Sequence, residues 1–358
     1  MDWKKLHYVK TDLIKCGLSI PIRHEHLYRV VDGDWNGRVV PIENFDVYKE
    51  TVSLLRDKED ILLYEYLKDD IEERKTRTER LVKFFEEIKQ NGYKSQYELS
   101  NEKVFLKEQM DDEIVVAIDP QGHLVVINGW HRISMVKILG IKEIPVIVGI
   151  RHKEWVDFCN DFTSFTKIWK NEIQDVYHPI EHLDFKHLKP MWGEQRYNII
   201  KDSMFVKEGT LLDVGAHLGF FCHRFEEDGF ECTALENHEP YLKYLEKFKE
   251  ANYRNFKIDN RSIFDLKSYS FDVILCMNIL HHFLKSKNEY EQLIRLLSKI
   301  NTRELYIQIP SDDETQMKNV YVNYNQVDFL NLISEQTKMK YIQIGIERQR
   351  PIFKFTRE

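Results

Sequence analysis

The residues whose order most clearly predicts chemistry lie in the stretch Thr210–Phe221. A short apolar run carries an acid, Asp213, near its end, and two glycines follow it, Gly215 and Gly219. From His217 onward the apolar residues recur at helical spacing. Because glycine lets a ligand approach the backbone closely, a strand, a glycine turn and a helix predict the start of a nucleotide-binding βαβ unit.

The acids near this turn indicate which ligand it binds. A carboxylate at Asp213 repels a pyrophosphate and suits an ammonium group, so a dinucleotide is disfavoured. Glu236 follows the next apolar run, near the ~20-residue offset at which an acid binds ribose hydroxyls. An adenosine with a cationic amino-acid tail and no phosphate is S-adenosylmethionine (SAM), which we therefore expect as the cofactor.

These residues resemble those of the class I SAM-dependent methyltransferases, and the resemblance covers residues 196–358. The matching segments are Asp213–Gly219, Glu236, Ser262–Asp265 and Phe271–His282. The resemblance implies a Rossmann-like domain with a mostly parallel, seven-stranded sheet. It also implies the residues that bind SAM: Asp213, Gly215, Ala216 and Gly219 around the methionine end, Glu236 at the ribose, Ser262 and Ile263 at the adenine, and Asn278 after the fourth strand.

Two histidines, His281 and His282, follow the fourth expected strand, where the methyl acceptor is expected to bind. An imidazole with a pKa near neutrality is the usual base for a hydroxyl acceptor. We predict that one of them deprotonates an oxygen acceptor, such as a sugar, a polysaccharide or a phosphate group, while at least one serves only to cap or pack. The segment Met277–Leu280 lacks the Asn/Asp-Pro-Pro-Tyr/Phe motif used for exocyclic base amines, which disfavours an adenine-amine acceptor.

A second pattern lies in the N-terminal half, at Asn128–Arg132. Two apolar runs flank the turn Asp119–Gly122 and predict a hairpin, after which a glycine turn opens a helix. The start of a helix that carries a histidine and an arginine is suited to bind an anion, because its backbone amides add to the side-chain charges.

This arrangement resembles the ParB/sulfiredoxin-like fold, over about residues 15–155. The resemblance implies an α+β domain that binds nucleotide phosphates at Gly129, His131 and Arg132, with a nucleoside triphosphate and Mg²⁺ as candidate ligands. Glu25 is a candidate base for phosphoryl transfer in such a domain. Trp130 stands beside the histidine and no cysteine does, which disfavours sulfinic-acid reduction. The alternative is that the histidine and the arginine only stabilise the turn.

Alternating patterns predict the elements that hold these residues in place. From the glycine turn onward strands and helices alternate, which is typical of an α/β protein whose parallel sheet is covered on both faces. Two late apolar runs, Tyr341–Ile346 and Ile352–Phe355, are expected to form an antiparallel edge pair. In the N-terminal half, helices are expected over residues 52–90 and 152–169. The expected domains are residues 1–155, a connecting helix and linker at 156–195, and the methyltransferase domain at 196–358.

The composition excludes several classes of protein. A length of 358 residues suggests two domains, and 42% hydrophobic with 31% charged residues is typical of a globular protein. A net charge of −7 and a pI near 6.1 disfavour general affinity for nucleic acid. The five cysteines show no paired spacing, no signal peptide is recognised, and no apolar run reaches the ~20 residues of a membrane span. We therefore expect a cytoplasmic protein with reduced thiols.

The favoured interpretation is a SAM-dependent methyltransferase that acts on a small molecule or a glycan, with polysaccharide biosynthesis as a natural setting. One alternative is a nucleic-acid methyltransferase whose ParB-like domain binds DNA or RNA, and another is a regulatory protein that binds SAM and a nucleotide without catalysis. No metal is assigned to His178, His182 and His187, because Pro179 disrupts helical spacing between them. The sequence leaves the acceptor and the oligomeric state open.

Overall fold

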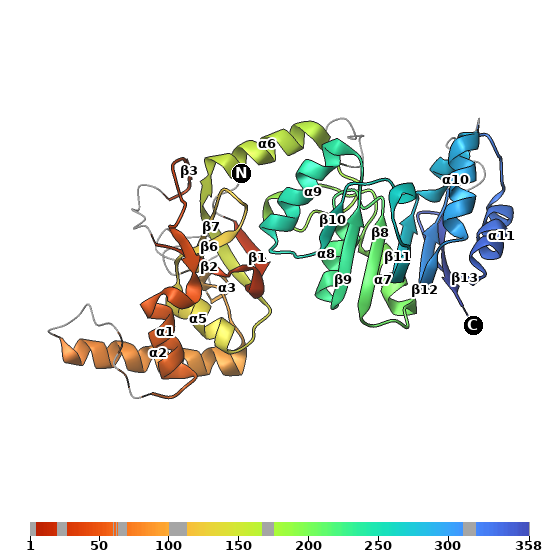
Figure 1. Cartoon of the computed structure of the whole chain (residues 1–358). Coiled ribbons are helices and arrows are strands. Elements are labelled where there is room, and N and C mark those ends of the chain that lie inside the picture. Colours follow the sequence, from red (N-terminus) through yellow and green to blue (C-terminus); the bar gives the residue numbers. More distant parts are fainter. Residues whose placement is uncertain are drawn as a thin grey trace. The chain divides into compact units, whose positions relative to one another are not determined.

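The chain folds into two compact units, Met1–Thr163 and Ser164–Glu358, in the computed structural model (Figure 1). Among the described residues no helix is both long and apolar enough to cross a membrane. The predicted base Glu25 lies outside the described residues. The structure describes residues 5–19, 27–59, 61, 63, 70–99, 113–166, 175–310 and 320–357.

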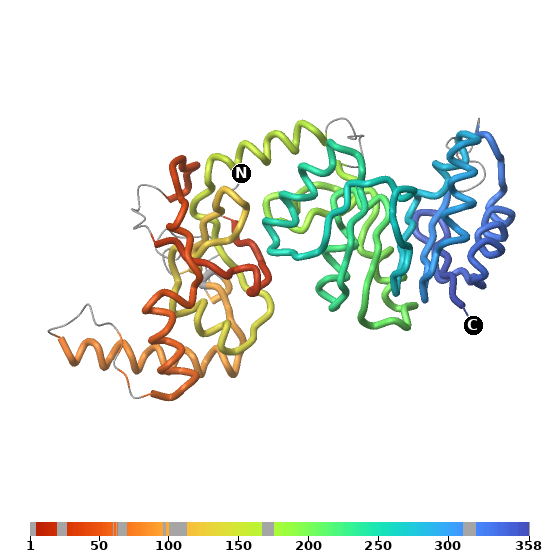
Figure 2. Tube along the Cα trace, in the orientation of Figure 1, coloured from red at the N-terminus to blue at the C-terminus, as the bar shows by residue number. Residues whose placement is uncertain are grey.

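The second unit is built on a seven-stranded sheet with the order β10-β9-β8-β11-β12-β14-β13. Figure 2 shows the path of the chain through this sheet, in green to blue. All neighbouring strands are parallel except β14, which runs antiparallel to both β12 and β13, so the predicted α/β class and late antiparallel pair are confirmed. The strands are β8 (Gly209–Val214), β9 (Phe230–Leu235), β10 (Lys257–Asp259), β11 (Ser270–Met277), β12 (Asn301–Gln308), β13 (Lys340–Glu347) and β14 (Arg350–Thr356).

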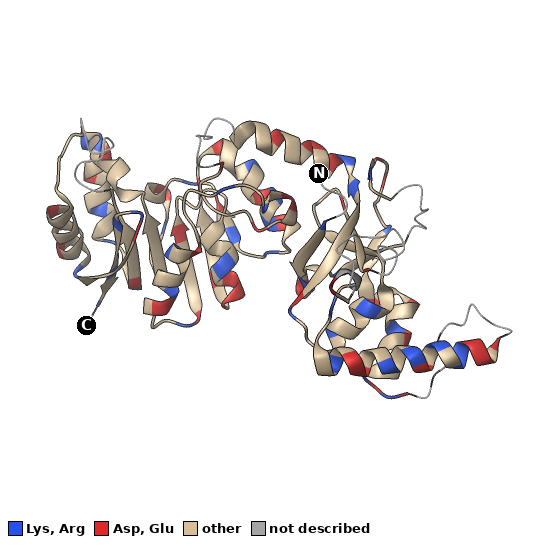
Figure 3. Cartoon of the chain, turned by 180° about the vertical axis from the view of Figure 1, so that it is seen from behind, with Lys and Arg blue, Asp and Glu red and all other residues tan. Residues whose placement is uncertain are grey.

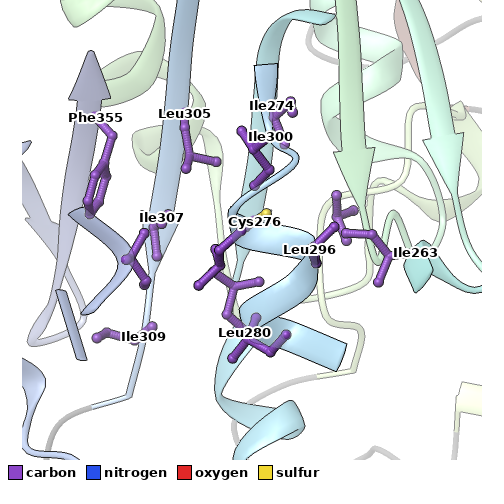
Figure 4. Close-up of a cluster of buried hydrophobic side chains, with 14 of the residues drawn as sticks. Ile263, Ile274, Cys276, Leu280, Leu296, Ile300, Leu305, Ile307, Ile309 and Phe355 are labelled. Atoms are coloured by element: carbon purple, nitrogen blue, oxygen red, sulfur yellow. The ribbon is translucent and has the colours of Figure 1, made fainter. Parts of the chain in front are cut away.

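Both faces of this sheet are buried. Along β8, Leu212 and Val214 belong to one hydrophobic cluster and Leu211 to the other, because successive side chains of a strand point to opposite faces. The first cluster includes α10 and α11, and Figure 4 shows part of it. The second includes α7, α8 and α9. The helices are α7 (Glu194–Ser203), α8 (Phe220–Glu227), α9 (Glu239–Ala251), α10 (Lys287–Leu297) and α11 (Gln326–Thr337).

Residues 175–193, expected as linker, pack within the second unit. Their backbone is irregular apart from a short 3-10 turn, Leu183–Phe185, and a bridge between Val176 and Pro190. Proline interrupts regular structure without preventing burial. The segment therefore buries apolar side chains although it shows no helical or strand period: Val176, Ile180, Leu183, Phe185 and Trp192.

The first unit has a mixed seven-stranded sheet of its own. Six of its strands follow the order β1-β7-β5-β6-β2-β4, and β3 pairs with β7. The predicted hairpin is confirmed, since β5 and β6 are antiparallel around a turn where Asp119 Oδ1 accepts from Gln121 N and His123 N. The strands are β1 (Leu6–Lys10), β2 (Cys16–Leu18), β3 (Arg29–Val31), β4 (Val39–Pro41), β5 (Val115–Ile118), β6 (Leu124–Asn128) and β7 (Glu143–His152).

One expected helix of the first unit is divided in the structure. The helix expected over residues 52–90 is two helices in the described part, because α1 ends at Leu55 and Asp70 caps the start of α2 by accepting from Glu73 N. Acidic and basic side chains alternate along α2 (Figure 3), as is typical of a solvent-exposed helix face. The helices are α1 (Asp46–Leu55), α2 (Ile71–Asn91), α3 (Gln96–Leu99), α5 (Trp130–Ile138) and α6 (Lys153–Thr166).

Candidate functional site

The order of strands in the second unit reverses direction at β8, and open parallel sheets have a ligand crevice at the carboxyl end of such a strand. The neighbours of β8 are β9 on one side and β11 on the other, so the direction of winding changes at β8. Ligands of open parallel sheets bind at such a switch point, beyond the carboxyl ends of the strands. Asp213, which lies beside Ala234 of β9 and Leu275 of β11, is close to this end.

The glycine loop after β8 has the tight turn that the sequence predicts. Gly215 and Gly219 have φ angles of 70° and 79°, in the left-handed region that favours glycine. The backbone amides of Gly215 and Ala216 donate to Leu235 O at 2.9 and 3.0 Å. A Cβ at Gly219 would lie 2.6 Å from Leu245 Cδ1, so a larger residue would push α8 away from α9.

Glu236 is held at the end of β9 by two backbone amides. Its Oε1 accepts from His238 N at 2.8 Å and its Oε2 accepts from His217 N at 2.9 Å. A carboxylate has about four lone-pair positions, so each oxygen retains the capacity to accept another hydrogen bond. The carboxylate is therefore oriented and can accept from a pair of hydroxyls.

Asp213 is a buried carboxyl group with an unsatisfied oxygen. Its side chain is 2% exposed, and Oδ2 hydrogen-bonds to no described residue. Burial and the nearby Glu236 raise the pKa of Asp213 to about 7, while Arg196 opposes the shift. A buried acceptor without a donor is costly, so the geometry suits a ligand that brings a positively charged donor.

Arg196, on α7, is a site residue that the sequence analysis missed. Its Nε donates to Glu347 Oε2 at 2.8 Å, and its guanidinium stacks on Trp192, 3.9 Å from the ring centroid. Its Nη2 is buried and has no partner among the described residues. The sequence offered one signal for this residue. Arg196 lies four residues before Ile200, on the same face of the helix, and Ile200 is fully buried. A free, buried guanidinium donor near Asp213 suits a carboxylate beside an ammonium group.

Asn278 and Tyr177 lie on the β11 side of the crevice. Asn278 has a φ of 57°, and its Nδ2 donates to Tyr177 OH at 3.3 Å and to Gln308 Oε1 at 3.2 Å. The Tyr177 ring lies 5.4 Å from the His217 ring, which in turn lies 4.2 Å from Tyr241. The predicted Asn278 is thus joined to an aromatic wall that comes partly from the segment expected as linker.

Ser262 and Ile263, predicted to pack the adenine, follow β10. The Ser262 hydroxyl accepts from Phe264 N at 3.3 Å and caps a 3-10 turn, Ile263–Asp265. The Ile263 side chain is 6% exposed and belongs to the first hydrophobic cluster. The structure thus places both at the carboxyl end of the sheet, with Ile263 mostly in the core.

The two predicted catalytic histidines have different surroundings. Both lie on a 3-10 helix, Leu280–Leu284, with ring centroids 4.1 Å apart. His281 is fully buried, whereas His282 is half-buried and its Nδ1 lies 3.1 Å from Lys285 Nζ. Burial and Lys285 lower the pKa of His282, so its imidazole is neutral at pH 7. His282 is the better placed of the two to accept a proton.

The segment predicted to bind phosphate, Asn128–Arg132, lies wholly in the first unit. Gly129 has a φ of 84°, and a Cβ there would lie 2.9 Å from Ile114 Cα. Thr51 Oγ1 donates to Val47 O, so it accepts from His131 Nδ1 at 2.8 Å. Burial and Arg132 lower the pKa of His131 to about 4. The imidazole of His131 is therefore neutral at pH 7, and the positive charge at this turn comes from Arg132.

A hollow of about 400 Å³ lies between α2 and α5 in the first unit. It contains three guanidinium groups and no carboxylate among its lining residues, although Arg77 pairs with Glu73 of its own helix. The lining residues are Arg77, Arg80, Leu81, Phe84, His131, Arg132 and Met135.

Comparison with known proteins gives a family match within the second unit. Residues 212–302 match the family model described as a methyltransferase domain. This part of the chain is a methyltransferase domain. The match includes the glycine loop, Glu236 and both histidines, and it implies SAM as the methyl donor. A comparison with curated proteins found no match.

Several solved structures are similar to part of the chain. Monomeric WbdD is 19% identical, with 54% of this chain and 48% of that one covered and a TM-score of 0.42. A structure of the bifunctional kinase-methyltransferase WbdD is 17% identical, with 54% of this chain and 46% of that one covered and a TM-score of 0.44. Magnesium protoporphyrin IX methyltransferase from Synechocystis, with bound SAM, is 14% identical, with 45% of this chain and 74% of that one covered and a TM-score of 0.36. The chain spans about half the length of the two WbdD structures.

Proposed function

We propose that the second unit transfers a methyl group from SAM to an oxygen of a sugar, a polysaccharide or a phosphate group. The observation that carries this proposal is the unsatisfied Oδ2 of Asp213, buried between the glycine loop and Glu236 in a methyltransferase domain. These residues fit the cofactor. Asp213 suits the ammonium group, Arg196 the carboxylate and Glu236 the ribose hydroxyls, while Gly215 and Gly219 give the loop its tight turn.

When bound, SAM supplies a methyl group on a positively charged sulfur. The chain has to hold the acceptor oxygen in line with that group and take up its proton. His282 is neutral and half-buried, and the lone pair of its Nδ1 faces the exposed Lys285. Because Lys285 is exposed, an acceptor hydroxyl can replace its ammonium group at Nδ1. His282 then accepts the proton as the methyl group is transferred.

The test of this function is a methyl-transfer assay on the whole chain. Labelled SAM is incubated with nucleotide-sugars, phosphorylated sugars and RNA, and the product is analysed for the methylated atom. Label on a sugar or phosphate oxygen supports the proposal. Label that enters only RNA, or a methyl group on nitrogen, would favour the nucleic-acid alternative instead.

Glu236→Ala is expected to weaken SAM binding by about 1–3 kcal/mol, because the ribose hydroxyls lose a charged acceptor that two backbone amides hold in place. Calorimetry on the purified chain measures this loss. Glu231→Gln is a matched control, since Glu231 is exposed at the opposite end of the same strand. Unchanged SAM affinity in Glu236→Ala would show that Glu236 does not bind the ribose hydroxyls.

We also propose that the hollow of the first unit binds the phosphates of a nucleotide, in support of a phosphotransferase role for this unit. The support is the cationic lining around Arg132 and the turn at Gly129. Arg132→Ala is expected to abolish saturable binding of a nucleoside triphosphate in the presence of Mg²⁺. Tight binding of duplex DNA without nucleotide binding would instead favour a nucleic-acid module.

A further inference from the structure

The turn between β13 and β14 lies at the same edge of the sheet as the methyltransferase crevice. In the strand register Glu347 lies opposite Arg350 at the end of this hairpin. Gln308, at the carboxyl end of β12, lies opposite Ile352 of β14. Since β14 is antiparallel to β12, the turn residues Arg348 and Gln349 project beyond the carboxyl ends of the strands. This is the edge at which Asp213 and Asn278 lie.

Three guanidinium groups gather around one indole ring at this edge. The guanidinium of Arg196 lies 3.9 Å from the centroid of Trp192, that of Arg350 5.3 Å and that of Arg348 5.9 Å. Glu347 pairs with Arg196. Arg348 is exposed and forms no ion pair with a described residue. Arg348 therefore carries a positive charge that no described side chain balances.

The hairpin turn keeps its arginine at a conformational cost. Arg348 and Gln349 have φ angles of 46° and 66°, which two-residue turns normally give to asparagine and glycine. A turn that only joined two strands would be more stable with those residues. A non-glycine residue held in this region is a reason to look for a function of its side chain.

A hydrogen-bonded path joins the turn to the crevice. Asn278 Nδ2 donates to Gln308 Oε1 at 3.2 Å, and Gln308 Nε2 donates to Arg350 O at 3.1 Å. Gln308 is fully buried, so this path is part of the packed structure. The arginine cluster thus borders the crevice on the β12 side, away from Glu236 and the ribose end.

We propose that Arg348, with Arg350 and the face of Trp192, binds an anionic group of the methyl acceptor. This inference rests on the proposed methyltransferase function and narrows its substrate class to acceptors that carry a phosphate or a carboxylate. Guanidinium groups bind both oxyanions with charge-assisted, often bidentate hydrogen bonds. The cluster holds the charged end while the acceptor hydroxyl lies toward His282.

The first test compares acceptors that differ only in charge. A neutral sugar, its phosphate ester and its uronic acid are offered to the whole chain with saturating SAM. Arg348→Gln is expected to raise the KM for the charged acceptors about 10- to 100-fold, with kcat and SAM affinity unchanged. Arg303→Gln is the matched control, because Arg303 is exposed at the opposite end of β12. Equal use of the neutral sugar by the wild type would overturn the inference.

A binding test separates this inference from the methyltransferase proposal. Calorimetry measures inorganic pyrophosphate binding to the whole chain in the presence of SAM. We expect Arg348→Gln to weaken it about 10-fold or more, whereas binding that is lost in Arg80→Gln instead belongs to the hollow of the first unit. No binding, or no change in Arg348→Gln, contradicts the anion site. Binding that depends on Arg348 without any methyl transfer leaves the anion site standing and rejects the proposed function.

Discussion

Asp213→Asn is expected to lower the affinity for SAM by about 2–4 kcal/mol, roughly 30- to 1,000-fold. The carboxylate is 2% exposed and Oδ2 has no described partner, so in the proposed complex it is the counter-charge of the ammonium group. Asparagine keeps the shape and removes the charge. Calorimetry measures the loss, with Glu231→Gln as the control for removing an acid from the same sheet.

The affinity of the wild type for SAM is expected to depend on pH because of the ionisation of Asp213. Because the pKa of Asp213 is raised to about 7, the free protein holds a proton on this group below that pH. An ammonium group binds the ionised form, so binding expels the proton and the affinity falls as pH drops below about 7, by up to 10-fold per unit. Calorimetry in buffers of different ionisation enthalpy counts the proton released. Affinity that stays constant between about pH 5.5 and 8 would contradict this role.

The raised pKa of Asp213 also affects the free energy of unfolding. A carboxyl whose folded-state pKa is raised binds more protons in the folded than in the unfolded state, between its ordinary pKa and about 7. The free energy of unfolding is therefore expected to fall as pH rises through this range. Asp213→Asn should remove that slope without SAM, as denaturant titrations at several pH values can show.

His282→Ala is expected to lower the rate of methyl transfer by about 100-fold or more while leaving SAM affinity unchanged. The reason is that a hydroxyl acceptor has to lose its proton, and His282 offers a neutral imidazole at the end of β11. Single-turnover assays with saturating SAM measure the rate. His281→Ala, at a fully buried neighbour, is expected to lower the melting temperature more than the rate. Normal turnover in both variants would place the base elsewhere.

Lys285→Met provides a sharper test of the same base. Lys285 helps to lower the pKa of His282, so its removal is expected to raise that pKa toward the ordinary value. A base acts in its deprotonated form, so the rate rises with pH through its pKa. The acid limb of kcat/KM should therefore move to higher pH in Lys285→Met, and be absent in His282→Ala. If the acid limb does not move in Lys285→Met, it reports the ionisation of another group.

The sequence by itself determined the architecture of the second unit. Strands and helices of a βαβ chain each carry their own period, so they alternate along the chain as predicted, and the glycine turn follows Asp213 as expected. The late apolar runs likewise form β13 and β14. These features are local, because a residue's neighbours within a few positions set its pattern.

Only the tertiary structure decided which other residues belong to the site. Residues 175–193 have no period, yet Tyr177 and Trp192 pack at the crevice because burial there follows shape and not a repeat. Arg196 and Glu347 meet across 151 positions of sequence, a contact that no single sequence pattern encodes. Burial separates His281 from His282, although the two are adjacent and chemically identical, because the 3-10 turn points them into different surroundings.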